Sequence, residues 1–235
     1  MPTSFYKIGH RGAAGYSKEN TLDSFQKALS LGANMIELDV HRCQSGEVVV
    51  AHDKDIERLT SQKGLIKEKG LTELKQLGFF SLAQVLEHLP FHTNINIELK
   101  ERETAEPVAE LLRYHLKIGK FQFDNFLISS FDFSAIKKFK TLMPQIKVGL
   151  LISRNPFSCL IKIFPFVIDF YIRRARKIKA FSLHLDKKLV RPNIIKKIHQ
   201  NNLRIFVYTV NQSEEIKQLK QWGVDGIFSD YPDRL

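Results

Sequence analysis

Short apolar runs alternate with stretches of helical periodicity along almost the whole chain, and this alternation constrains the fold most strongly. The apolar runs predict strands at residues 5–9, 35–40, 95–100, 126–129, 146–152, 180–185, 203–210 and 226–229. Helices are predicted between them at 20–31, 81–88, 105–116, 133–141, 157–177, 192–200 and 213–222. Strands that alternate with helices favour a parallel sheet with right-handed crossovers. Eight strands in 235 residues favour an α/β TIM (β/α)8 barrel, with a doubly wound sheet as the alternative.

One region interrupts this alternation after the second predicted strand. Residues 41–53, HRCQSGEVVVAHD, leave no room for a crossover helix. Ser45-Gly46 predicts a two-residue hairpin turn, which would place Asp39 opposite His52. Residues 53–80 are charged and contain glycine. We therefore expect them to form a small insertion before the next barrel helix.

Composition excludes several other classes of protein. A chain that is 43% hydrophobic and 26% charged is typical of a globular protein, not of a disordered one. Two cysteines, Cys43 and Cys159, exclude a disulfide scaffold and a four-cysteine zinc site. No linker separates a second domain, so we expect residues 1–235 to form a single domain. The N-terminal sequence does not resemble a signal peptide, which predicts a cytoplasmic protein.

Acidic residues occupy alternate positions in two predicted strands. Glu37 and Asp39 share one face of strand 35–40, because side chains alternate along a strand. Glu98 shares a face with Lys100 in the same way. If the apolar faces pack on outer helices, these charges point into the barrel, where a hard divalent cation would offset their repulsion. The alternative interpretation is a set of exposed carboxylates on irregular strands.

Two histidines and two cations are expected near these carboxylates. His10 ends the first predicted strand, and His52 is expected opposite Asp39. A lone histidine is usually structural, but imidazole titrates near neutral pH, so a pair can donate and accept a proton. Arg11 and Lys100 add positive charge at the strand ends, where barrel enzymes place their chemistry. The set indicates an anionic substrate beside a metal.

Eight motifs occur in an order that resembles the glycerophosphodiester phosphodiesterase family. They are HRG at 10–12, ENT at 19–21, IELDV at 36–40, HD at 52–53, IELK at 97–100, SSF at 129–131, YTVN at 208–211 and GVDGIFSD at 223–230. The resemblance covers nearly the whole chain. It implies a single catalytic barrel with a small insertion after the second strand. It also implies hydrolysis of glycerophosphodiesters to glycerol 3-phosphate and an alcohol.

The resemblance implies a role for each matching residue. The expected acid–base pair is His10 and His52, and the expected ligands of one divalent cation, Mg²⁺ or Ca²⁺, are Glu37, Asp39 and Glu98. The expected phosphate contacts are Arg11 and Lys100, with Glu19 and Asn20 in a supporting loop. Tyr208 stands where the family usually has tryptophan, so we expect it to line the substrate pocket with a different shape. Lys18 and His41 depart from the family pattern and are expected not to touch the catalytic residues.

The segment 157–179 suggests a second hypothesis about the substrate. Its apolar part is short and interrupted by charges and a proline, so it is not a convincing membrane span. We interpret it as the fifth barrel helix. The alternative is a peripheral membrane surface, which would favour a lysophospholipase D-type activity on lysophospholipids. A non-catalytic barrel that binds anions or membranes is the third hypothesis.

The net charge of +11 suits anionic phosphodiesters or anionic membranes. Basic residues occur along the whole chain, and no nucleic-acid motif interleaves them with aromatic residues. We therefore expect a small-molecule glycerophosphodiester as substrate and no nucleic-acid partner.

Overall fold

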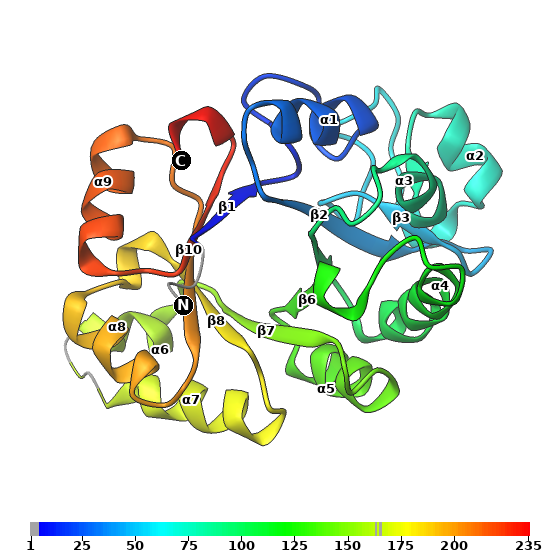
Figure 1. The fold of residues 1–235 in the computed structure, drawn as a ribbon. Helices are drawn as coiled ribbons and strands as arrows, with labels where there is room; N and C mark the ends of the chain where they lie inside the picture. Colours follow the sequence, from blue (N-terminus) through cyan, green and yellow to red (C-terminus); the bar gives the residue numbers. More distant parts are fainter. Residues whose placement is uncertain (1–4, 163, 165) are drawn as a thin grey trace.

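A computed structural model describes residues 5–162, 164 and 166–235, whose arrangement Figure 1 shows. Eight parallel strands form a closed ring. The ring consists of β1 (Tyr6–Gly9), β2 (Met35–Arg42), β5 (Ile95–Leu99), β6 (Phe126–Ser130), β7 (Lys147–Ile152), β8 (Ser182–Asp186), β9 (Arg204–Tyr208) and β10 (Gly226–Ser229). It closes because β1 pairs in parallel with both β10 and β2. The predicted TIM barrel is confirmed.

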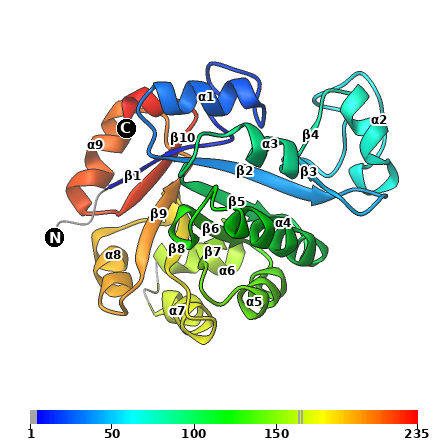
Figure 2. The ribbon, with the colours of Figure 1, turned by 45° about the vertical axis from the view of Figure 1, so that its right-hand side comes forward.

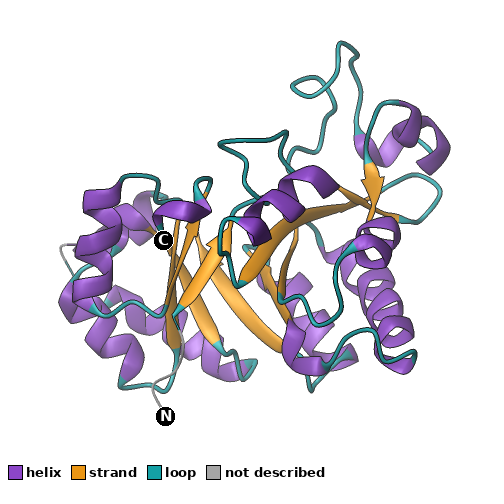
Figure 3. Ribbon diagram, turned by 45° about the horizontal axis from the view of Figure 1, so that its top comes forward, coloured by secondary structure: helices purple, strands orange, loops and turns teal. Residues whose placement is uncertain are grey.

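Helices enclose the ring on its outer side, as Figure 3 shows. They are α1 (Leu22–Ser30), α3 (Leu82–His88), α4 (Ala105–Lys117), α5 (Phe133–Leu142), α6 (Pro156–Cys159), α7 (Val167–Lys177), α8 (Pro192–His199) and α9 (Ser213–Trp222). Capping residues determine where several of these helices begin or end. Thr21 caps α1 by accepting a hydrogen bond from the Ser24 backbone N–H, and Gly223, with a φ of +88°, ends α9. The chain finishes in a short 3₁₀ turn, η6 (Pro232–Arg234).

Side chains alternate between two environments along the ring strands. In β2, Ile36, Leu38 and Val40 join the core between the sheet and the helices. The barrel interior contains a second cluster, made by Ile8, Met35, Leu127, Phe206 and Phe228. This cluster closes the barrel below its C-terminal end, so inward-facing polar groups above it form the floor of a pocket.

The hairpin after β2 has a register one residue away from the predicted one. In β3 (Val48–Val50), Val50 pairs with Val40, and the Ala51 backbone N–H donates to the Asp39 carbonyl at 3.0 Å. The predicted pairing of Asp39 with His52 is therefore wrong. The loop contains three residues instead of two, because Gly46 adopts a φ of +100° that glycine allows at no steric cost. His52 instead follows the strand.

The predicted insertion lies beyond β3, on the right-hand side in Figure 2. It contains a 3₁₀ turn, η1 (Ile66–Glu68), then α2 (Leu71–Gln76), and it leads into β4 (Phe80–Ser81), which pairs with β3. Its buried residues Ile56, Ile66 and Leu74 pack with Val49 and Ala51 in a small separate core. The hairpin thus joins the insertion to the barrel.

The helix predicted at 157–177 is not continuous. The described residues form α6, a 3₁₀ turn η4 (Leu160–Lys162) and α7. A proline at position 165 lacks the N–H that a continuous helix needs at that point, and residues 163 and 165 lie outside the described residues. Within the described chain, we find no helix with the length and apolar character needed to cross a membrane.

Candidate active site

A pocket opens at the C-terminal ends of the ring strands and is lined by all eight site residues predicted from the sequence. They are His10, Arg11, Glu37, Asp39, His52, Glu98, Lys100 and Tyr208. The same wall includes Asn96, Ser129, Phe131 and Leu151. Residues from seven ring strands or the loops after them therefore meet at one point, which is where barrel enzymes hold their substrates.

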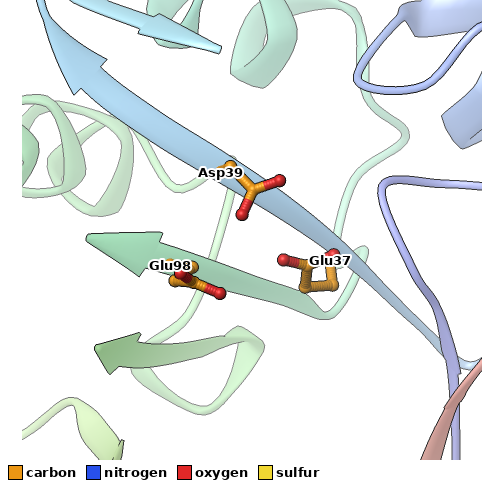
Figure 4. A group of neighbouring side chains, drawn as sticks. All are labelled: Glu37, Asp39 and Glu98. Carbon is orange, nitrogen blue, oxygen red and sulfur yellow. The ribbon is translucent and has the colours of Figure 1, made fainter. Parts of the chain in front are cut away.

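The three carboxylates form a compact buried group (Figure 4). Glu37 and Asp39 project from β2, and Glu98 from β5, where it pairs in register with Asp39. One oxygen of each lies within 4.8 Å of the others, and the residues are at most 8% exposed. Burial, with repulsion from Asp39, raises the pKa of Glu37 to about 8 and also raises that of Glu98. This donor set fits a hard divalent cation, whose charge would offset the repulsion.

Two cations hold Asp39 ionised inside this group. Lys100 Nζ lies 2.6 Å from Asp39 Oδ1 and 2.5 Å from Glu98 Oε1. Arg11 Nε lies 3.4 Å from Asp39 Oδ2, and the Arg11 backbone N–H donates to Glu37 Oε2 at 2.7 Å. Although burial opposes ionisation, the charges of Lys100 and Arg11 lower the pKa of Asp39 to about 2. The buried carboxylates are therefore unequal in charge.

The backbone at Arg11, whose N–H donates to Glu37 Oε2, adopts an unusual conformation. Arg11 has a φ of +50°, a conformation that is uncommon for residues other than glycine. Gly12 follows with a φ of +87°, and a Cβ there would lie 2.3 Å from Ser24 Oγ. The tripeptide after β1 thus needs glycine at its third position. The Asn20 backbone N–H donates to the Arg11 carbonyl at 3.0 Å, and its Nδ2 donates to Asp39 Oδ2 at 3.1 Å.

His10 has a carboxylate partner from the other end of the chain. Its Nδ1 lies 2.7 Å from Asp230 Oδ1, and Asn211 Nδ2 donates to Asp230 Oδ2 at 2.6 Å. Burial alone would lower the pKa of His10, but the bond to Asp230 and the charge of Glu37 together raise it. Nδ1 is therefore occupied, and Nε2 is left for a group in the pocket.

His52 is held through a chain of charged groups that includes the insertion. Its Nδ1 lies 2.7 Å from Asp53 Oδ1, while Asp53 Oδ2 accepts from Arg58 Nε at 2.6 Å. Arg58 also donates both terminal nitrogens to Glu19, at 2.7 and 3.0 Å, and Glu19 accepts from Arg11 at 3.1 Å. Burial lowers the pKa of His52 below its ordinary value. One arginine of the insertion thus connects the loops that carry His52 and Arg11.

His41 also contacts the His52 loop, so its expected separation from the catalytic set is wrong. Its Nε2 donates to the His52 carbonyl at 3.1 Å, and its Nδ1 lies 2.8 Å from Glu101 Oε2. His41 follows Asp39 and Val40 in β2, and Glu101 follows β5. These contacts hold the His52 backbone, in addition to the contacts of its side chain with Asp53.

The partners of the two histidines were missed in the sequence analysis. Asp230 is 220 residues from His10, and Arg58 is 39 residues from Glu19. Asp53 and Asp230 fall inside the HD and GVDGIFSD motifs, which are the only sequence signals for them. Arg58 lies in the charged insertion without such a signal.

Aromatic rings form the apolar side of the pocket. Tyr208 donates its hydroxyl to the Ile152 carbonyl at 2.8 Å, so its ring and not its hydroxyl is presented to the pocket. Phe131 packs edge-on against it, with the ring centroids 6.0 Å apart. The pocket thus has an apolar aromatic wall and a charged floor.

A sequence model of the glycerophosphoryl diester phosphodiesterase family matches residues 10–234. The glycerophosphodiester phosphodiesterase of Bacillus altitudinis is 32% identical over 246 residues, which cover 97% of this chain and 95% of that protein. The crystal structure of the Thermotoga maritima glycerophosphodiester phosphodiesterase is 31% identical, with a TM-score of 0.80 over 97% of this chain and 96% of that one. An Oleispira antarctica phosphodiesterase in complex with the product sn-glycerol-3-phosphate is 28% identical, with a TM-score of 0.83 over 97% and 93%. The chain therefore belongs to the glycerophosphoryl diester phosphodiesterase family and is an enzyme of that family, a phosphoric diester hydrolase.

Proposed function

We propose that the chain is a metal-dependent hydrolase that cleaves glycerophosphodiesters to glycerol 3-phosphate and an alcohol by histidine acid–base catalysis. The observation that carries this proposal is the convergence of three buried carboxylates, two histidines and two cations in one pocket. The bound product of the Oleispira antarctica relative supports glycerol 3-phosphate as the product.

Glu37, Asp39 and Glu98 would hold one divalent cation, Mg²⁺ or Ca²⁺. Both ions prefer carboxylate oxygens, and the three buried carboxylates lie close enough together to share one cation. A cation bound there supplies charge stabilisation for the phosphoryl oxygens as the bond breaks. Arg11 and Lys100 add fixed positive charge beside the same oxygens, so the phosphate is held between the cations and the histidines.

The two histidines have opposite pKa directions, which suits an acid–base pair. His10 is the more readily protonated of the two, because Asp230 favours its imidazolium form. His52 is the less readily protonated, because burial disfavours its charge. His10 would then donate a proton from Nε2 to the departing alkoxide, and His52 would accept one from the nucleophile. The nucleophile is water or the 2-hydroxyl of the glycerol itself, which would give a cyclic phosphate first.

Tyr208 would line the pocket for the glycerol or the alcohol. Its hydroxyl is engaged with the Ile152 carbonyl, and its ring packs on Phe131. The contribution of Tyr208 is therefore apolar contact and shape, which positions the diester over the charged floor.

The test is the release of glycerol 3-phosphate from glycerophosphocholine, glycerophosphoethanolamine and glycerophosphoglycerol, each with Mg²⁺, with Ca²⁺ and with EDTA. We expect release that needs one of the metals, and following the phosphorus species over time separates the direct route from the cyclic one. No release from any diester under any condition would overturn the proposed substrate class.

A second candidate activity is the lysophospholipase D-type cleavage of lysophospholipids. Exposed Phe131, directly after β6, and exposed Phe157, in α6 after β7, favour it, because they offer apolar surface to an acyl chain. Equal or faster turnover of lysophosphatidylcholine than of glycerophosphocholine would support this candidate.

Family membership argues against the non-catalytic barrel. A cytoplasmic location, peripheral at the membrane for lipid substrates, stays a prediction.

A further inference from the structure

Positive charge is concentrated on one side of the barrel. Residues 133–200 contain 16 Lys and Arg but only 2 Asp and Glu, a formal net charge of +14. The other residues contain 20 Lys and Arg and 23 Asp and Glu, a net charge of −3. The basic segment includes α5 to α8, which lie together in the lower half of Figures 1 and 2. The whole excess charge of +11 therefore comes from this side.

Large apolar side chains are exposed on the same side. Five of the eleven exposed large apolar residues in the described part of the chain fall within residues 157–170: Phe157, Leu160, Phe164, Phe166 and Phe170, with exposures between 37% and 65%. Phe157 packs on Phe170 at 5.5 Å, and Phe164 on Phe166 at 5.7 Å, between ring centroids. Pairs of neighbouring exposed rings form a patch of the kind that marks an interaction surface.

Cations continue this patch along α7. Phe170, Arg173, Arg174 and Lys177 are spaced by three or four residues and so share one face of the helix. The Arg174 guanidinium lies over the Phe170 ring at 5.4 Å. Asp169, the acidic residue of this helix, is paired with Lys197 at 2.8 Å. Arg173 and Lys177 are exposed, and no carboxylate pairs with either of them among the residues that the structure describes.

The patch also adjoins the active-site pocket. α6 follows β7 after a short connection, and in β7 Leu151 lines the pocket and the Ile152 carbonyl accepts the Tyr208 hydroxyl. Exposed Arg154 lies in the short connection between β7 and α6. The exposed rings therefore begin beside the pocket opening.

We propose that this aromatic–basic face docks on an anionic lipid bilayer. The face consists of the five apolar residues at 157–170 together with Arg154, Arg173 and Lys177. Rings at the level of the head groups, flanked by cations that meet anionic lipid, are the combination that holds a protein on a bilayer surface. A second copy of the chain is a poorer occupant, because the face carries charge of one sign and would repel itself. Docking does not depend on the proposed reaction, although it would bring the pocket opening close to lipid phosphodiesters.

Co-sedimentation of the full chain with vesicles tests this proposal. The vesicles contain phosphatidylcholine alone or with about a third phosphatidylglycerol, in low salt and in about 0.5 M salt, where charge interactions are screened. We expect binding to the anionic vesicles that falls with salt. Arg173→Glu with Lys177→Glu should weaken it by about tenfold or more, and Phe164→Ser with Phe166→Ser by a similar factor.

Matched controls use exposed residues of the same types elsewhere. Lys27→Glu with Lys217→Glu makes the same charge change on α1 and α9, and Phe91→Ser with Phe123→Ser removes equally exposed rings. These pairs should keep most of the binding. Release of glycerol 3-phosphate from soluble diesters should be unchanged in all four variants, which separates this proposal from the proposed function.

Three results would overturn the proposal. The wild-type protein could show no binding to anionic vesicles in low salt. The control pairs could weaken binding as much as the pairs in the face. Alternatively, size-exclusion chromatography with light scattering could show a dimer that Phe164→Ser with Phe166→Ser dissociates, which would assign the face to a second copy.

Discussion

Replacing Asp230 by asparagine removes the charged partner of His10 while keeping the shape of the side chain. The Nδ1–Oδ1 distance of 2.7 Å indicates a charge-assisted hydrogen bond, and both side chains are less than a quarter exposed. A hydrogen bond to a charged group stabilises the folded protein by about 1.5–3 kcal/mol. Because the charge of Asp230 favours the protonated imidazole, its loss should lower the pKa of His10.

The assay is the pH dependence of glycerol 3-phosphate release under saturating metal. If His10 acts as the acid, its imidazolium is lost at a lower pH in Asp230→Asn, so the alkaline limb of the profile should move to lower pH. At neutral pH, turnover should fall by about tenfold to a hundredfold, because the imidazole also loses its orienting partner.

Asp233→Asn is the matched control, because this exposed carboxylate accepts from the Tyr16 hydroxyl, at 3.0 Å, and from no other side chain that the structure describes. It should leave the profile in place. An unchanged profile in Asp230→Asn would refute the coupling of Asp230 to His10. Movement of the acidic limb instead would contradict the assignment of His10 as the acid.

Three further changes test the rest of the site. His52→Ala should lower turnover by about 10²- to 10⁴-fold with an unchanged thermal melt, and near-wild-type turnover would remove it from the chemistry. Arg58→Ala should lower turnover by about tenfold, because Asp53 and Glu19 lose their shared partner; Lys63→Ala, in the same insertion, should have no effect. In the metal-free protein, the pKa of Glu37, raised from 4.5 to about 8, means that the folded state binds more protons than the unfolded state between these values. Melting in EDTA should therefore show stability falling as pH rises from about 5 to 8, and Glu37→Gln should reduce this slope.

The main features of the site could be predicted from local patterns. Alternation in IELDV places Glu37 and Asp39 on one face and Ile36, Leu38 and Val40 on the other, because a strand has a period of two. Hydrophobic burial then forces the charged face into the barrel. The ends of the predicted strands pointed to His10 and His52, the motif resemblance added Tyr208, and the structure places all of these residues in one pocket.

A strand register that differs by a single residue, and contacts between residues far apart in the sequence, were harder to predict. The register of the β2–β3 hairpin differs by one residue, because Gly46 in a left-handed conformation allows a three-residue loop. Asp230 and Arg58 act across 220 and 39 residues, and no local pattern encodes such pairs. The segment predicted as one helix forms α6, η4 and α7 in the described residues, and a proline within an apolar helical pattern argues against one continuous helix.

Titration of the chelated protein with Mg²⁺ or Ca²⁺, with cation binding and glycerol 3-phosphate release measured in the same samples, tests the proposed site most directly. We predict one cation bound per chain, a return of turnover that follows its occupancy, and the loss of both in Glu98→Gln. Full turnover in EDTA with no cation bound, or turnover that Glu98→Gln leaves intact, would contradict a metal held by Glu37, Asp39 and Glu98.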